Sequence, residues 1–172
     1  MKRLFCLAAV AVVALGQSFT AHAAGLEFGV GHTSESTMTY RLGLKSDWDN
    51  SWLQSDVGRL TGYWDGAYTY WEGDKSSASS SLSFSPVLVY EFAGERVKPY
   101  VEAGIGVALF SHTEVEGNKL GTAFQFEDRL GFGVRFAGGH EVGIRATHYS
   151  NAGISSTNDG VESYALHYTM AL

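Results

Sequence analysis

Apolar and polar residues alternate with a period of two through most of the chain after residue 24. Successive side chains of a β-strand point to opposite faces, so this alternation predicts strands. Twenty-one glycines against two prolines, with 13% aromatic residues, are typical of a glycine-rich β protein rather than a helical one. We expect eight strands, within residues 26–32, 38–48, 60–70, 82–92, 97–109, 124–136, 141–150 and 162–172.

The two faces of these strands differ in polarity. In the fifth segment, for example, Val101 and Ile105 share one face and Glu102 lies on the other. Two architectures fit: a secreted soluble barrel with its apolar face inward, or a membrane barrel with its apolar face toward lipid. Several segments reach the roughly 9–11 residues that a tilted strand needs to cross a bilayer. We therefore predict an all-β, eight-stranded antiparallel transmembrane β-barrel, whose narrow interior is filled by charges of balanced sign.

The first residues predict export from the cytoplasm. A positively charged start, an apolar run over residues 4–15 and the ending Ala21-His22-Ala23 match a secretory signal peptide. We assign residues 1–23 to this peptide and residues 24–172 to the barrel. Cys6 lies ahead of the apolar core, which argues against a lipoprotein anchor. Its removal with the peptide leaves no thiol chemistry in the mature chain.

Charge and motif spacing exclude several functions. Loss of Lys2 and Arg3 with the peptide changes the formal net charge from −6 to −8, so a nucleic-acid partner is not expected. The histidines show no metal-ligand spacing, and we predict no metal site. The Gly-x-Gly at 104–106 lacks a following helix and is interpreted as packing space inside the barrel, not as a nucleotide site.

Loop lengths assign the two ends of the barrel, because outer-membrane barrels have short periplasmic turns and longer outer loops. We expect outer loops near residues 33–37, 73–80, 112–121 and 151–160, and periplasmic turns near 94–96 and 137–140. The long connection Ser46–Val57 is interpreted as an interfacial segment anchored by Trp48 and Trp52. The aromatic girdles at the two membrane interfaces are assigned to Tyr40, Trp48, Trp64, Tyr68 and Tyr70.

Three polar residues interrupt the apolar face near its predicted outer end. His148 and Ser150 continue the apolar row of their segment, and Glu162 falls on the apolar face of the last one. Pairing residue 148 with residue 162 places the carboxylate beside the imidazole. A serine hydroxyl becomes nucleophilic when a neighbouring base takes its proton and a third group holds that base. The pattern predicts a serine–histidine–glutamate triad, with Asn151 as a donor to the developing oxyanion.

Each of these residue types is also ordinary at a membrane rim, so residue types alone leave a non-catalytic interpretation open. Polar groups directed at lipid are costly, however, and a cluster of three needs a reason. Two other polar residues, His32 and Asp128, also lie on the apolar, outward face of their segments. We interpret His32 as a rim residue and assign Asp128 no role.

Segments along nearly the whole chain after residue 23 resemble the lipid A 3-O-deacylase (PagL) family. They are residues 38–44, 58–65, 124–131, 148–153 and 158–164. The resemblance implies an outer-membrane esterase, needing no cofactor, that removes the 3-linked acyl chain of lipid A in lipopolysaccharide. It matches the family's nucleophile, base and acid to Ser150, His148 and Glu162, and its oxyanion residue to Asn151. Leu172 departs from the terminal Phe of many outer-membrane barrels, which bears on assembly rather than chemistry.

The resemblance also implies partners and a location. Lipopolysaccharide and outer-membrane lipid are the expected partners, and the active site is expected to face the outer leaflet of a Gram-negative outer membrane. Two other functions stay open: a non-catalytic small barrel for adhesion or protection, and an outer-membrane phospholipase with the same triad. The formation of a homodimer is left open as well.

Overall fold

The structure, a computed structural model, describes residues 24–172. The predicted signal peptide, residues 1–23, lies outside the described residues. In the described part, no helix is long and apolar enough to cross a membrane.

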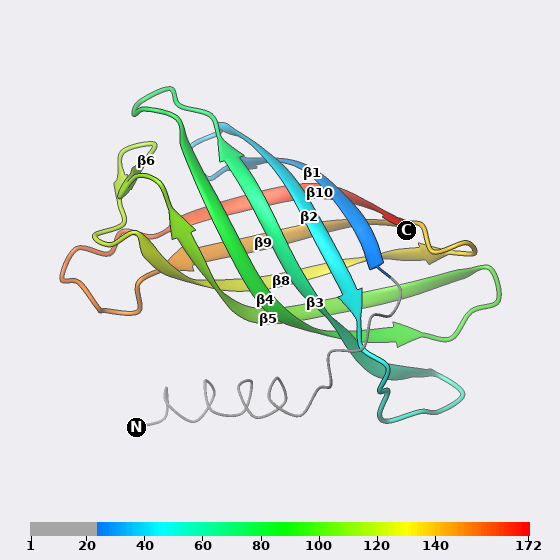
Figure 1. Cartoon of the computed structure of the whole chain (residues 1–172). Helices are drawn as coiled ribbons and strands as arrows, with labels where there is room; N and C mark the ends of the chain where they lie inside the picture. Colours follow the sequence, from blue (N-terminus) through cyan, green and yellow to red (C-terminus); the bar gives the residue numbers. More distant parts are fainter. Residues whose placement is uncertain (1–23) are drawn as a thin grey trace.

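Eight long antiparallel strands form a closed barrel (Figure 1). They are β1 (Ala24–Thr33), β2 (Met38–Asp47), β3 (Gly58–Trp71), β4 (Ser79–Phe92), β5 (Val97–Phe110), β8 (Phe124–Phe136), β9 (Glu141–Ser150) and β10 (Val161–Ala171). Strand β1 pairs with β2 on one side and with β10 on the other, which closes the sheet and leaves no open edge in lipid. The predicted eight-stranded antiparallel barrel is confirmed.

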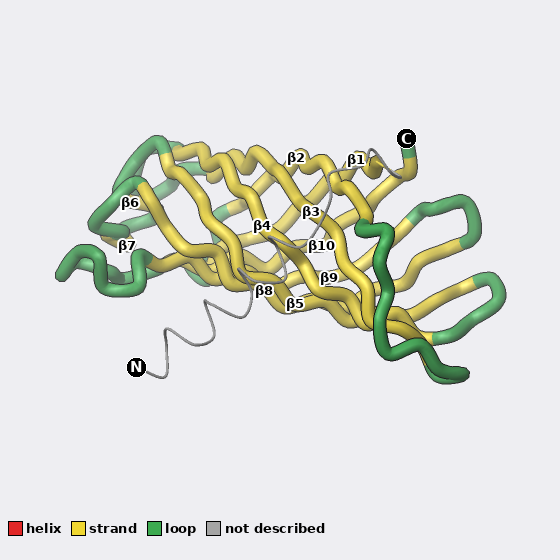
Figure 2. Tube along the Cα trace, turned by 60° about the horizontal axis from the view of Figure 1, so that its bottom comes forward, coloured by secondary structure: helices red, strands yellow, loops and turns green. Residues whose placement is uncertain are grey.

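The connections gather at the two ends of the barrel (Figure 2). Loops 34–37, 72–78, 111–123 and 151–160 lie at one end, and connections 48–57, 93–96 and 137–140 lie at the other. The first group is the predicted outer set. A short hairpin that the alternation did not predict, β6 (Glu114–Val115) and β7 (Asn118–Lys119), forms within the third outer loop.

The position of Trp48, in the segment after β2, differs from the predicted place in an aromatic girdle. The backbone N–H of Trp48 donates to the carbonyl of Gly62 at 2.8 Å, and Trp52 forms a β-bridge with Leu60. The Trp48 ring covers Gly62 so closely that a Cβ at that position would lie 2.3 Å from Trp48 Cζ3. Trp48 is therefore only 7% exposed, and it packs on β3 instead of facing lipid in a girdle. Tyr40, by contrast, is exposed as predicted.

The predicted facing of the strands is confirmed. The apolar rows point outward: Leu42 is 49% exposed and Leu130 is 67% exposed. The polar rows point inward, where Glu27 and Glu127 are fully buried. Such a barrel satisfies its backbone internally and presents a continuous apolar wall, as a protein in lipid requires.

Ion pairs fill the middle of the barrel interior. Arg145 donates through Nε to Glu102 at 2.6 Å and through Nη1 to Glu27 at 2.8 Å. Arg129 bonds both Asp65 and Glu127. Because these groups are buried, each charge needs its partners to offset the loss of hydration. The interior is a packed ionic core, as predicted from the polar rows.

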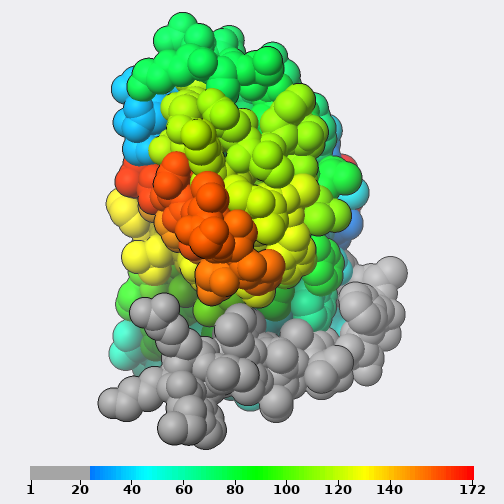
Figure 3. Space-filling view, turned by 90° about the vertical axis from the view of Figure 1, so that its left-hand side faces the viewer, coloured from blue at the N-terminus to red at the C-terminus, as the bar shows by residue number. Residues whose placement is uncertain are grey.

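An apolar cluster closes the outer end of the interior. Its members are Trp71, Ala108, Phe110, Val115, Leu120, Tyr149 and Val161. Val115 belongs to β6 and Leu120 follows β7, so the hairpin folds its apolar side chains over the mouth of the barrel. In the end-on view, loop 111–123 (yellow-green) and loop 151–160 (orange) lie side by side across this end (Figure 3). This cap supports the predicted site, which lies at its edge.

Candidate active site

His148 and Glu162 meet on the outer face of the barrel. They are directly opposite each other in the register of β9 and β10. His148 Nδ1 and Glu162 Oε1 lie 2.8 Å apart, within hydrogen-bond distance. Their side chains are 42% and 38% exposed, so both remain accessible from outside the barrel. The predicted pairing of residues 148 and 162 is confirmed, whereas their catalytic roles stay predictions.

Ser150 is the last residue of β9 and lies two residues beyond His148 on the same face. Residues two apart on a strand are about 6.6 Å apart at the backbone, so their side chains are neighbours. Since His148 Nδ1 faces Glu162, Nε2 is the ring nitrogen left for a hydroxyl group. No residue in the described range 24–172 forms a hydrogen bond with the Ser150 hydroxyl. Catalytic hydrogen bonds are often long before substrate binds.

Gly160 leaves space for the imidazole. Its φ is +74°, a conformation that side-chain-bearing residues rarely adopt. A Cβ at this position would lie 2.9 Å from His148 Cε1 and 3.1 Å from the carbonyl of Tyr149. The sequence pattern does not identify this residue, because a glycine before a strand is an ordinary turn signal.

A second loop contributes to the acidic residue of the site. The Ser34 hydroxyl donates to Glu162 Oε2 at 3.3 Å, while the other carboxylate oxygen faces His148. Ser34 therefore restrains the carboxylate from the side of β1. No pattern near Ser34 identifies this role, since it depends on the closure between β1 and β10.

Asn151 anchors the loop that follows the serine. It is fully buried, and its Nδ2 donates to the carbonyls of Leu120 and Thr157 at 2.9 and 2.8 Å. Its Oδ1 accepts the backbone N–H of Gly153 at 2.8 Å. Both hydrogens of the side-chain amide are thus used within the loops. The predicted oxyanion role of Asn151 stays a prediction, and donation from this amide requires breaking one of these bonds.

Glu116 ties three outer loops together. Its carboxylate accepts the Thr37 hydroxyl at 2.8 Å and the backbone N–H groups of Asp74 and Lys75 at 2.9 and 3.2 Å. Its own N–H donates to Ser76 Oγ at 2.9 Å, in a backbone with φ of +54°. Desolvation by itself raises the pKa of Glu116, but these donors outweigh it and the pKa is lowered. The ionised carboxylate of Glu116 therefore holds the hairpin of β6 and β7 in place. The carbonyl of Leu120, which accepts a hydrogen bond from Asn151, follows directly after this hairpin.

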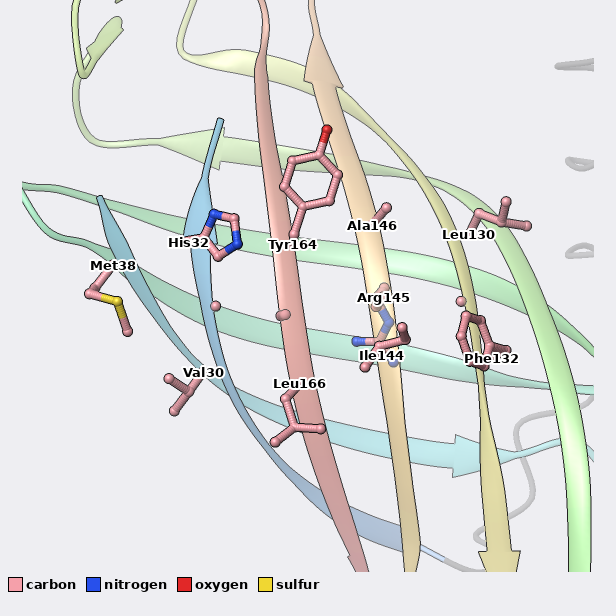
Figure 4. Close-up of a pocket in the computed structure, with 13 residues that line it drawn as sticks. Val30, His32, Met38, Leu130, Phe132, Ile144, Arg145, Ala146, Tyr164 and Leu166 are labelled. Carbon is pink, nitrogen blue, oxygen red and sulfur yellow. The ribbon is translucent and has the colours of Figure 1, made fainter. Parts of the chain in front are cut away.

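An apolar groove of about 570 Å³ runs along the outer wall from a point next to the site (Figure 4). Ala146 lies two residues before His148 on β9, and its short side chain forms part of the floor. Leu130 and Ile144 rise from β8 and β9, and Tyr164 rises from β10. The groove has the shape and polarity to hold a hydrocarbon chain that starts at the site.

Comparisons with known proteins give a consistent result. The family model described as "Lipid A 3-O-deacylase (PagL)" matches residues 36–171. A protein of Pseudomonas aeruginosa, "Lipid A deacylase PagL", is 55% identical over 173 residues and is covered fully, as is this chain. A protein of the same name from Bordetella bronchiseptica is 31% identical, over 84% of this chain and 80% of its own. The solved "Crystal structure of the outer membrane enzyme PagL" matches with a TM-score of 0.83 and 57% identity, covering 86% of this chain and 99% of that one.

Proposed function

The chain belongs to the lipid A 3-O-deacylase (PagL) family, and on this premise we propose that it is an outer-membrane ester hydrolase that removes the 3-linked acyl chain of lipid A. The observation that carries the proposal beyond family membership is the His148–Glu162 pair, set on the lipid-facing surface next to Ser150. Polar groups on that surface are costly, so a cluster of them supports a functional role.

The chemistry follows from the three side chains. His148 Nε2 takes the proton of the Ser150 hydroxyl as Oγ attacks the ester carbonyl. Glu162 holds the Nδ1–H tautomer and stabilises the imidazolium. Collapse of the tetrahedral intermediate breaks the bond to the sugar oxygen, which receives the proton from His148. Water, activated by the same imidazole, then cleaves the acyl-enzyme and releases the fatty acid.

The substrate reaches this site from the membrane and not through the barrel. The interior is filled by ion pairs and capped by the apolar cluster, whereas His148 and Glu162 open to the outside. A lipid in the outer leaflet has its esters near the outer ends of the strands. With the ester at Ser150, the acyl chain extends away from the loops into the groove over Ala146 (Figure 4).

Stabilisation of the oxyanion is assigned to the corner that follows the nucleophile. We retain Asn151 as the donor, on the support of its position next to Ser150. Its amide also holds Leu120 and Thr157, so Asn151→Ala removes the loop anchor together with the donor. Asn151→Asp keeps the acceptor for Gly153 but lacks the amide hydrogens, so it also loses the bonds to Leu120 and Thr157 together with the oxyanion donor.

Mass spectrometry of lipid A from cells with and without the chain tests the proposal. The expected result is loss of one acyl chain at position 3, with the matching free fatty acid released. Unchanged lipid A with released phospholipid acyl chains would instead support a phospholipase. No change in either lipid, with the barrel folded in the membrane, would support the non-catalytic alternative.

A further inference from the structure

The carboxylate of Glu162, the proposed acid, is bound at both of its oxygens. Oε1 lies 2.8 Å from His148 Nδ1, and Oε2 accepts the Ser34 hydroxyl at 3.3 Å. Within residues 24–172, no third group bonds to this carboxylate. A glutamate side chain has three rotatable bonds, so a carboxylate that is 38% exposed and bound at one oxygen alone can turn away from the imidazole. The second contact, with Ser34, limits that rotation.

The closure of the barrel brings Ser34 to Glu162. The pairing of β1 with β10 ends where Thr33 lies opposite Ser163. One step further along both strands, Ser34 comes opposite Glu162, just as His148 lies opposite Glu162 on the other side of β10. The acid on β10 therefore lies between the base on β9 and a hydroxyl group at the end of β1.

The turn that carries Ser34 is fixed by its own hydrogen bonds. The backbone N–H of Thr33 donates to the carbonyl of Thr37 at 2.8 Å. The Thr33 hydroxyl accepts the backbone N–H groups of Glu35 and Thr37, at 3.2 Å each. The Thr37 hydroxyl donates to Glu116, which attaches the turn to the hairpin of β6 and β7. A group on a fixed support of this kind can hold its partner in one orientation.

We propose that Ser34 is a positioning residue of the esterase site: its hydroxyl orients the Glu162 carboxylate toward His148 and so speeds the attack by Ser150. The inference rests on the proposed esterase function. The acid of such a triad holds the Nδ1–H tautomer of the base and stabilises the imidazolium that forms during the reaction. Both effects depend on the orientation of the carboxylate. Loss of the Ser34 hydroxyl should therefore lower kcat and leave KM unchanged.

Two other roles for Ser34 lead to different expectations. A hydroxyl that bound the sugar of the substrate would change KM, and its effect would persist in the absence of Glu162. A hydroxyl that only stabilised the turn would act on folding. The bonds within the turn come from Thr33 and Thr37, however, and in the part of the chain that the structure describes the Ser34 hydroxyl bonds to Glu162 alone.

The experiment is a double-mutant cycle with purified, detergent-folded full-length protein and lipid A as the substrate. Ser34→Ala should lower kcat by about 3- to 10-fold, the range for one hydrogen bond, with KM unchanged. Ser34→Thr, which keeps the hydroxyl group, should restore most of the rate. In a Glu162→Ala protein, Ser34→Ala should have no further effect, because no carboxylate is left for the hydroxyl to orient.

The control variant is Ser36→Ala, in the same turn. Ser36 is exposed, and no residue of the described range 24–172 bonds to its hydroxyl, so kcat and KM should stay at native values. A native kcat in folded Ser34→Ala, a change in KM alone, or an equal loss with and without Glu162 overturns the inference. A native protein that neither deacylates lipid A nor is labelled at Ser150 by an alkyl fluorophosphonate overturns the esterase proposal itself, and this inference with it.

Discussion

Charged side chains occupy two regions of this barrel under opposite conditions. In the interior, Arg145 lies between Glu27 and Glu102, all three are buried, and each accepts or donates several hydrogen bonds. On the outer face, His148 and Glu162 have one another, and one further contact comes from Ser34. A buried charge with several partners has no capacity left for a ligand. A half-exposed pair keeps a free ring nitrogen, and that difference separates a structural network from a site.

Substitution of the nucleophile gives the largest expected effect and tests the outer region. Ser150→Ala should lower kcat for lipid A deacylation by roughly 10⁴- to 10⁶-fold, as removal of a triad nucleophile does. Glu162→Ala should be about 10- to 100-fold milder, because this residue acts through the base. Release of the 3-linked acyl chain is measured by mass spectrometry. The control Ser156→Ala, in the exposed part of the loop, should retain activity, and a folded Ser150→Ala protein with near-native rates would contradict the triad.

Removal of an interior cation tests the other side of the comparison. Arg145→Ala leaves Glu27 and Glu102 buried without their main partner, so we expect unfolding to become easier by about 3–5 kcal/mol. Denaturant titration in detergent micelles measures this loss. Arg59→Ala is the matched control, since Arg59 is 44% exposed and pairs with Glu91 near the periplasmic end. It should cost less than about 1 kcal/mol. Equal midpoints for the two variants would show that the interior charges are not structural.

Gly160→Ala sharpens the comparison within the outer region. The added Cβ would displace the imidazole of His148, so kcat should fall about 10- to 100-fold while the barrel stays folded. Gly153→Ala is a matched control, because Gly153 also has a positive φ, +86°, but has nothing within 4 Å of the added atom. Both variants carry similar backbone strain, of about 1 kcal/mol. Equal activities would mean that space next to His148 is not limiting.

The smallest expected effect concerns the hydrogen bonds by which the Glu116 carboxylate joins the outer loops. Because the pKa of this carboxyl is lowered in the folded state, its contribution to stability is present above the unfolded pKa of about 4.3. The contribution is lost as the pH falls through the folded value. Hydrogen-exchange protection of the Asp74 and Lys75 amides should therefore decline at acidic pH. In Glu116→Gln, protection should be lower at neutral pH and independent of pH. A protection profile that is the same in both proteins would exclude the tie.

The local alternation of apolar and polar residues determined the strands of this protein and the face that each side chain takes. A period of two depends only on each strand, so the alternation identifies the eight strands, the lipid face and the outward facing of His148, Ser150 and Glu162. The pairing of residues 148 and 162 also follows locally, because loop 151–160 joins β9 directly to β10, which pairs with it in register. These features need no information from distant segments.

Tertiary structure alone decided what surrounds those residues. Ser34 and Glu162 are 128 residues apart in the chain, and they meet because β1 closes onto β10. Glu116 and the buried amide of Asn151 join loops whose positions depend on how the cap packs. Trp48 is buried because Gly62 leaves space for its ring on the neighbouring strand. Residue types and periodicity record which face a side chain takes. They do not record which distant backbone comes within hydrogen-bond distance, because that depends on closure of the barrel and on the packing of irregular loops.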